Sequence, residues 1–118
     1  MEREARRQSL NEKRAFLLEL LEIVDNFHRL LNLPADGNDA WRRGVEAIHQ
    51  QVVELLERHG VKPIEALGKP FDPYYHEALS TAFNPDIKHS TVIEEIRKGY
   101  VLNGELLRPS SVRVVANQ

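Results

Sequence analysis

His76 and Glu77 are the adjacent residues most suggestive of catalysis, because a zinc-protease helix contains this dipeptide. Such a helix needs a second histidine four residues after the first, and Ser80 stands there. We therefore expect no metal at His76. Its imidazole is expected instead to form a hydrogen bond that fixes the loop after Asp72 and Pro73.

The other four histidines have no carboxylate partner at a spacing that indicates a site. His28, His49 and His59 fall at polar or flanking positions of predicted helices, where a solvated imidazole is the usual case, and His89 falls in a predicted loop. The chain has no cysteine, so no disulfide and no thiolate ligand can form. We expect no metal ion in this protein.

Two further segments resemble parts of catalytic motifs. Gly68 and Lys69 look like the end of a phosphate-binding loop, but the first glycine of that loop would have to occupy the position of Pro63. Ser110 and Ser111 lack the flanking glycines of a hydrolase nucleophile. The sequence therefore predicts a binding protein with neither enzymatic activity nor a cofactor.

The composition is that of a soluble globular protein. Of 118 residues, 42% are hydrophobic and 29% are charged, and the net charge of -2 argues against a nucleic-acid partner, which requires a concentrated basic surface. The most apolar stretch, residues 16–24, is interrupted by Glu19 and Glu22, and the N-terminus is charged. We expect no membrane segment and a cytoplasmic location.

Residues 2–31 contain neither proline nor glycine, and their apolar residues recur at the spacing of a helix, which we place at about 2–32. One apolar stripe lies on this helix, and a second flank widens it, so the helix must contact more than one neighbour. The stripe consists of Leu17, Leu20, Val24, Phe27 and Leu31, and the flank of Phe16, Leu21, Ile23 and Leu30.

A second helix is predicted at about 39–59, after a break at Pro34 and Gly37, with Asn38 or Asp39 as its N-cap and Gly60 as its end. Its apolar stripe consists of Trp41, Val45, Ile48, Val52 and Leu55, and Val53 and Leu56 widen it. Two antiparallel helices cannot cover two wide apolar stripes, whereas two such hairpins form a four-helix bundle. We therefore infer a homodimer whose interface contains these five residues and the five of the first stripe.

Helical periodicity ends after Gly60, so we divide the chain into a helical dimerisation region, 1–60, and a small β domain, 61–118. Residues 92–96 and 112–115 read as strands. Asn103 and Gly104 favour the positive φ angles of a hairpin turn between residues 101 and 106. The predicted fold class is α+β.

Gly44 interrupts the second helix at a cost of about 1 kcal/mol relative to alanine. Two interpretations remain open. Either the crossing helix or a partner approaches the backbone closely there, or the glycine is merely tolerated.

Four segments resemble the GrpE family of nucleotide exchange factors in order and spacing, and together they cover nearly the whole chain. The most specific is 98–109, KGYVLNGELLRP, which is followed by Val112, Arg113 and Val114. The other three are 20–31, which is similar to the family's LLPVxDxLxRAL helix, 57–64, and 71–78, which is similar to its FDPxxHEA turn.

The resemblance implies a dimer with a four-helix bundle, from which two small β domains project. One β domain would bind the nucleotide-binding domain of a DnaK-type chaperone and tilt one lobe outward, so that ADP leaves and ATP can enter. The chaperone-binding residues that it implies are Arg7, Gly44, Ile96, Asn103, Gly104, Glu105 and Val114.

The chain departs from the family pattern in two places. Family members often carry arginine after the Asn-Gly turn, where this chain has Glu105, so an ion pair there would be absent or reversed. Residues 20–22 lack the family's proline, which should leave the first helix straighter. Relatives also carry a long coiled-coil stalk before the equivalent of residue 1, and without it we expect weaker dimerisation.

Two other classes of function stay open from the sequence. A structural dimerisation module would tether a partner through its helices, and would then tolerate replacement of Asn103 and Gly104. An enzyme of an unrecognised type would need a polar cluster in a pocket.

Overall fold

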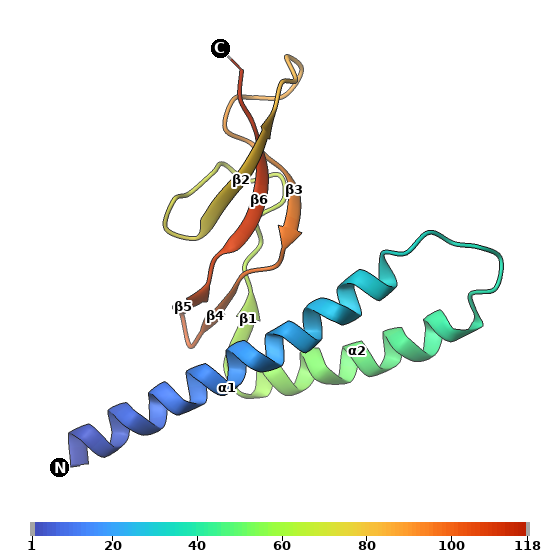
Figure 1. Ribbon diagram of the computed structural model, residues 1–118. Coiled ribbons are helices and arrows are strands. Elements are labelled where there is room, and N and C mark those ends of the chain that lie inside the picture. Colours follow the sequence, from blue (N-terminus) through green and yellow to red (C-terminus); the bar gives the residue numbers. More distant parts are fainter. Residues whose placement is uncertain (1, 118) are drawn as a thin grey trace. The chain divides into compact units, whose positions relative to one another are not determined.

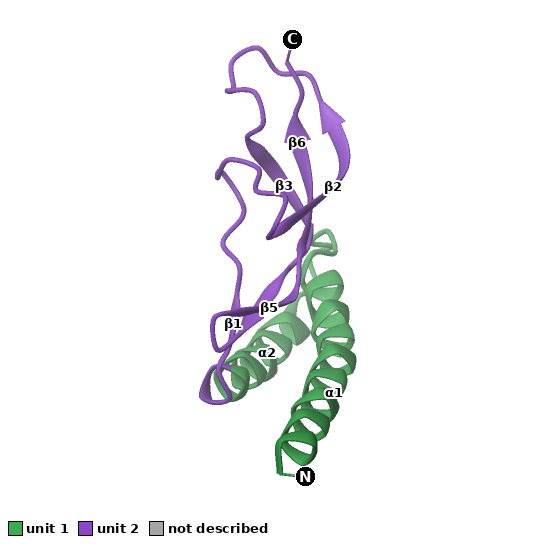
Figure 2. Ribbon diagram, turned by 90° about the vertical axis from the view of Figure 1, so that its left-hand side faces the viewer, with its two compact units in different colours: residues 1–56 green, residues 57–118 purple. Residues whose placement is uncertain are grey.

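The structure, a computed structural model, describes residues 2–117 and contains two helices followed by six strands. The chain forms two compact units, which Figure 2 shows in different colours. We call residues 1–56 the helical unit and residues 57–118 the β unit. The predicted α+β class, a helical hairpin followed by a β domain, is confirmed.

The helical unit is an antiparallel hairpin of α1 (Glu2–Leu31) and α2 (Ala40–Arg58), as Figure 1 shows. Arg42, in the first turn of α2, donates hydrogen bonds to the carbonyl oxygens of Leu31 and, at 2.9 Å, Leu33. These carbonyls at the C-terminal end of α1 lack partners within their own helix. The Arg42 guanidinium therefore caps α1 and fixes the connection between the helices.

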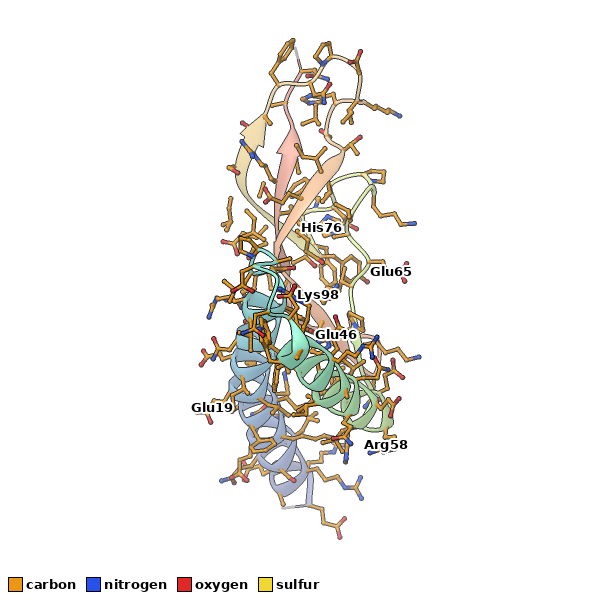
Figure 3. All side chains as sticks on the ribbon, turned by 90° about the vertical axis from the view of Figure 1, so that its right-hand side faces the viewer. Glu19, Glu46, Arg58, Glu65, His76 and Lys98 are labelled. Carbon is orange, nitrogen blue, oxygen red and sulfur yellow. The ribbon has the colours of Figure 1, made fainter. Side chains whose placement is uncertain are left out.

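Only part of the long helix is buried. Leu17, Leu21 and Val24 are almost inaccessible, at 4%, 0% and 0% exposure, whereas residues 2–13 are all exposed. Glu19 projects away from the same helix (Figure 3). The amphipathic spacing in α1 thus buries apolar side chains near the middle of the helix and leaves its first part exposed.

The β unit contains two three-stranded sheets. The first has the order β1-β4-β5 and is antiparallel. The second has the order β2-β6-β3, in which β2 pairs parallel to β6 and β3 pairs antiparallel to it. The strands are β1 (Val61–Pro63), β2 (His76–Ala82), β3 (Val92–Arg97), β4 (Tyr100–Leu102), β5 (Glu105–Arg108) and β6 (Ser110–Val115).

A hydrophobic core lies against the second sheet. Ala66, Val92, Val112 and Val114 form a buried cluster, and Phe71 packs on it. Alternation along β6 places Val112 and Val114 on this side, while Arg113 between them is exposed. The core thus joins β3 and β6 to the loop that precedes β2.

The Asn-Gly hairpin is confirmed. Asn103 and Gly104 have φ angles of 51° and 86°, and β4 pairs with β5 directly across them. Both residues are therefore left-handed, as the two-residue turn that matches strand twist requires.

The sequence did not reveal β1 and β2. The first has three residues and ends at Pro63, which cannot donate a ladder hydrogen bond. The second is exposed at five successive positions, from Glu77 to Thr81, so it lacks the alternation that identifies a strand. The expected hydrogen bond of His76 is confirmed, because its Nδ1 accepts from the backbone N–H of Asp72 at 2.9 Å.

Candidate protein-binding site

The residues implied for partner binding are spread over both units. Arg7 lies in the exposed first part of α1, and Gly44 is exposed on α2. The other five lie in the β unit: Ile96 on β3, Asn103 and Gly104 in the β4–β5 turn, Glu105 at the start of β5, and Val114 on β6. These five residues therefore belong to one compact unit.

The β4–β5 turn is fixed to the segment that follows α2. The backbone N–H of Asn103 donates to the Gly60 carbonyl at 2.8 Å. A Cβ added at Gly60, whose φ is +83°, would lie only 2.0 Å from Asn103 Oδ1. The Asn103 side chain therefore fills the space that the glycine leaves, and this residue has a structural role whatever else it contacts.

A second close contact holds the two sheets of the β unit together. The Gly99 N–H donates to Ser110 Oγ at 3.0 Å, and a Cβ at Gly99 would lie 2.3 Å from the Ser110 backbone nitrogen. Arg108 is 4% exposed, donates from Nε to the Lys98 carbonyl at 2.9 Å, and places its guanidinium 5.4 Å from the centre of the Tyr100 ring. Much of the KGYVLNGELLRP segment thus has an architectural role.

Besides the exposed turn residues Asn103 and Gly104, two other residues implied for partner binding are exposed in the β unit. Ile96 is 50% exposed near the end of β3, and Glu105 is exposed just after the rigid turn. Beside Ile96, Lys98 Nζ lies 3.1 Å from Glu95 Oε1 in an ion pair. The surface therefore offers an apolar residue beside paired charges and, in the other sheet, an acidic residue on a fixed hairpin.

Val114 is different, because it is 8% exposed and belongs to the core cluster. Its side chain packs with Ala66, Val92 and Val112. Val114 can therefore support a binding surface by holding β6 and β3 together, and the structure offers little of its side chain to a partner.

Gly44 lies in open space within this chain. A Cβ built on it meets no atom within 4 Å, so the crossing helix does not need the glycine. Of the interpretations offered by the sequence, two remain: close approach of a partner, or mere tolerance of glycine.

The residues expected at the dimer interface differ in burial. On α1, Leu17 and Val24 are buried within the chain, while Leu20, Phe27 and Leu31 are half-buried. On α2, Val45 and Val52 are half-buried. Trp41, Ile48 and Leu55 are 37%, 51% and 42% exposed and recur every seven residues.

The second apolar flank of α1 is also open. Phe16, Ile23 and Leu30 are 64%, 55% and 37% exposed, again at intervals of seven residues. Each helix of the hairpin therefore carries an exposed apolar row in addition to the residues buried inside the chain.

Three features were not predicted from the sequence. Leu79 and Phe83 are 55% and 74% exposed at β2 and just after it, where no strand was predicted. The loop after Phe83 is held by Asn117, whose Nδ2 donates to the carbonyls of Asn84 and Ile87 at 2.8 and 2.7 Å.

His28 and His49, expected to be solvated, instead contact each other across the hairpin. Their spacing could have suggested this, since they occupy helices predicted to be antiparallel.

Within residues 2–117, no three histidine or acidic side chains gather in a way that could hold a metal ion. Neither α1 nor α2 is long and apolar enough to cross a membrane.

Comparison with known proteins gives a consistent result. The GrpE family model matches residues 1–116. Protein GrpE of Carboxydothermus hydrogenoformans is 44% identical over 103 residues, covering 87% of this chain and 53% of the relative. Protein GrpE of Geobacillus kaustophilus is 42% identical over 98 residues, with coverages of 81% and 46%. That of Methanosphaera stadtmanae is 38% identical over 117 residues, with coverages of 92% and 66%.

The chain thus spans between about half and two thirds of the length of these relatives. The match nevertheless extends over both the helical unit and the β unit. The chain belongs to the GrpE family.

Proposed function

We propose that this chain is a nucleotide exchange factor for a DnaK-type chaperone. Its β unit binds the chaperone's nucleotide-binding domain, promotes ADP release and so allows ATP to bind and substrate to leave. The observation that carries the proposal is family membership over residues 1–116, in a chain whose signature segment builds a rigid, partly exposed hairpin.

The proposed contact surface consists of Ile96, Gly104 and Glu105, with Asn103 fixing the turn and buried Val114 holding β6 and β3 together. Rigidity matters for this role, because a binding protein opens a cleft only by binding the open state more tightly than the closed one. A flexible hairpin would adapt to both states and lose that difference. The fixation of Asn103 at Gly60 and of Gly99 at Ser110 supports such a preference.

Arg7 and Gly44 form a proposed secondary contact on the helices. Arg7 is exposed and can approach an acidic group, and the open space beside Gly44 allows a partner's backbone or side chain to lie close to α2. No bond is made or broken by this chain in the proposed mechanism.

We further propose that the chain acts as a homodimer through its helices. The exposed rows Phe16, Ile23, Leu30 and Trp41, Ile48, Leu55 would pack in a four-helix bundle, in which each seven-residue spacing keeps the row facing its partner. Replacing Ile48 by lysine should dissociate the dimer in analytical ultracentrifugation. A sedimentation coefficient unchanged by I48K would argue against this interface.

The binding proposal is tested by measuring affinity for the nucleotide-binding domain of the same organism's chaperone, with and without ADP. The chain should bind the nucleotide-free domain at least tenfold more tightly, since only this difference can drive release. Equal affinity for the two states would contradict the proposed function.

Glu105→Arg tests the surface itself. Because the family's usual arginine is replaced here by an acid, we expect Glu105 to face a basic group, and reversal of its charge should weaken binding about tenfold. Glu65→Arg is the matched control, because Glu65 is exposed in the same unit and lies outside the proposed surface (Figure 3). An equal loss of affinity in both variants would show that Glu105 does not contact the chaperone.

A further inference from the structure

His28 and His49 form a pair between the two helices of the hairpin. His28 lies in the last turn of α1 and His49 near the middle of α2, and their Nε2 atoms are 3.0 Å apart. The ring centres are 4.8 Å apart, and the ring planes meet at 68°. Both side chains are half-buried, so solvent reaches the pair while the helices hold its geometry.

The contact is a hydrogen bond between imidazoles when one ring carries a proton on Nε2 and the other presents its lone pair. If both rings instead carry their proton on Nδ1, the two Nε2 lone pairs are left facing the same small space. This change of tautomer keeps both rings neutral and moves no net charge. The pair can therefore offer two nitrogen ligands without unfolding the hairpin.

The separation of the two nitrogens suits a single metal ion. Ligands about 2.0–2.1 Å from a zinc ion lie about 2.9 Å apart at a right angle and about 3.4 Å apart at the tetrahedral angle. The observed 3.0 Å falls between these values. An ion could thus replace the shared proton with a shift of the side chains of only a few tenths of an ångström.

We propose that His28 and His49 form a binding site for one divalent transition-metal ion, which bridges α1 and α2 through the two Nε2 atoms. Imidazole favours zinc, nickel and copper over the hard ions magnesium and calcium, which prefer oxygen. Among residues 2–117 no group of three histidine or acidic side chains is arranged to hold a metal ion, so water completes the coordination of this two-histidine site. The aromatic ring of Phe27 neighbours the site, with its centre 6.2 Å from that of His49.

Such an ion would join the last turn of α1 to the middle of α2. It binds the folded hairpin and not separated helices, so its presence stabilises the helical unit. The site is independent of the proposed exchange function, because neither histidine belongs to the proposed chaperone-binding surface.

The test uses the full chain and zinc ions alone. We expect saturable binding of one zinc per chain by isothermal titration calorimetry, and no binding of magnesium. In nitrogen-resolved NMR of the wild-type chain, the Nε2 signals of His28 and His49 should shift together and reach their end point at one equivalent. Zinc at ten times its dissociation constant should also raise the melting temperature by about 4 °C.

His28→Gln and His49→Gln should each weaken zinc binding at least tenfold, whereas His59→Gln, which removes an exposed histidine outside the pair, should leave it unchanged. Equal losses in all three variants would show general surface binding and overturn the proposal. Should a variant lose helicity in circular dichroism, the wild-type NMR titration decides. Unshifted Nε2 signals of His28 and His49 at one equivalent of zinc would then exclude the site.

Discussion

Thirteen hydrophobic residues are buried among residues 2–117, and only four of them lie in the helical unit. The remaining nine lie in the β unit, which is of similar length. Among the same described residues, large exposed hydrophobic side chains show the opposite distribution, with nine in the helical unit and five in the β unit. The β unit therefore has its own core, while the helical unit leaves much of its apolar surface exposed within the chain.

The difference follows from how each unit meets its hydrogen-bonding and packing needs. A helix satisfies its backbone internally, so α1 and α2 can form while an apolar row stays open. Strands must pair, and pairing β6 between β2 and β3 places Val112 and Val114 in one cluster with Val92. Substitutions in the core of the β unit should thus lower the stability of the folded chain. Substitutions in the exposed apolar rows of the helical unit should instead weaken association.

The largest effect is expected for Gly99→Ala. Its Cβ would meet the backbone of Ser110 at 2.3 Å and of Pro109 at 2.6 Å, which cannot move like a flexible side chain. We expect a loss of about 3 kcal/mol in the free energy of unfolding of the β unit. Chemical denaturation followed by tyrosine fluorescence measures this, and an unchanged midpoint would show that the two sheets do not pack so closely.

Val112→Ala should cost the β unit about 2 kcal/mol, because it leaves a cavity at a residue with 0% exposure. Its counterpart in the helical unit is Ile48→Ala, at a residue 51% exposed. At concentrations where the chain is monomeric, thermal unfolding of the Ile48 variant should match the wild type. A much lower melting temperature for the monomeric Ile48 variant than for the wild type would show that Ile48 stabilises the single chain, as Val112 does.

The stabilities of the two units should depend differently on protein concentration, so dilution distinguishes them without any substitution. If the helices are held by association, each tenfold dilution lowers their stability by about 1.4 kcal/mol in the dimer range, whereas the β unit stays unaffected. Far-ultraviolet circular dichroism at 222 nm reports the helices, and tyrosine fluorescence reports the β unit. A concentration-independent helical transition would contradict dimerisation through α1 and α2.

Gly44→Ala should stabilise the helical unit by about 1 kcal/mol, since nothing in the chain occupies the space that the methyl group would enter. The same variant should bind the chaperone more weakly if a partner approaches α2 at this point. Thermal unfolding and an affinity measurement on one preparation distinguish the two remaining interpretations. Higher stability with unchanged affinity would identify a merely tolerated glycine.

The smallest effect is expected for Glu94→Gln. Its carboxylate lies 3.8 Å from the Arg113 guanidinium across β3 and β6, and both side chains are about half exposed. Exposed pairs of this kind contribute about 0.5 kcal/mol or less. A loss above 1 kcal/mol in chemical denaturation would show that the strand edge depends on this ion pair.

The parts of the fold that the sequence predicted are those with strong local signals. The two helices were recognised from apolar spacing, and the β4–β5 hairpin from Asn103 and Gly104, because these features depend on neighbours along the chain. β2 was missed because its parallel partner β6 is more than thirty residues away and its own side chains are mostly exposed.

The same distinction applies to the candidate site. Sequence resemblance indicated residues 98–109, but it could not show that Gly99 and Arg108 are needed for packing while Glu105 is exposed. It placed Val114 on the surface because a motif carries no information about which side of β6 faces the core. The His28–His49 contact joins residues twenty-one positions apart and depends on how the two helices pack.

The central claim is that the chain opens the nucleotide site of a chaperone by binding, without chemistry of its own. The most direct measurement is the dissociation rate of fluorescently labelled ADP from the same organism's DnaK-type chaperone, recorded by stopped flow with the chain present at a tenth of the chaperone concentration. We predict a rate at least tenfold higher than without the chain, with the increase reduced in Glu105→Arg. An ADP dissociation rate unaffected by the wild-type chain, even at a stoichiometric concentration, would contradict the proposed function.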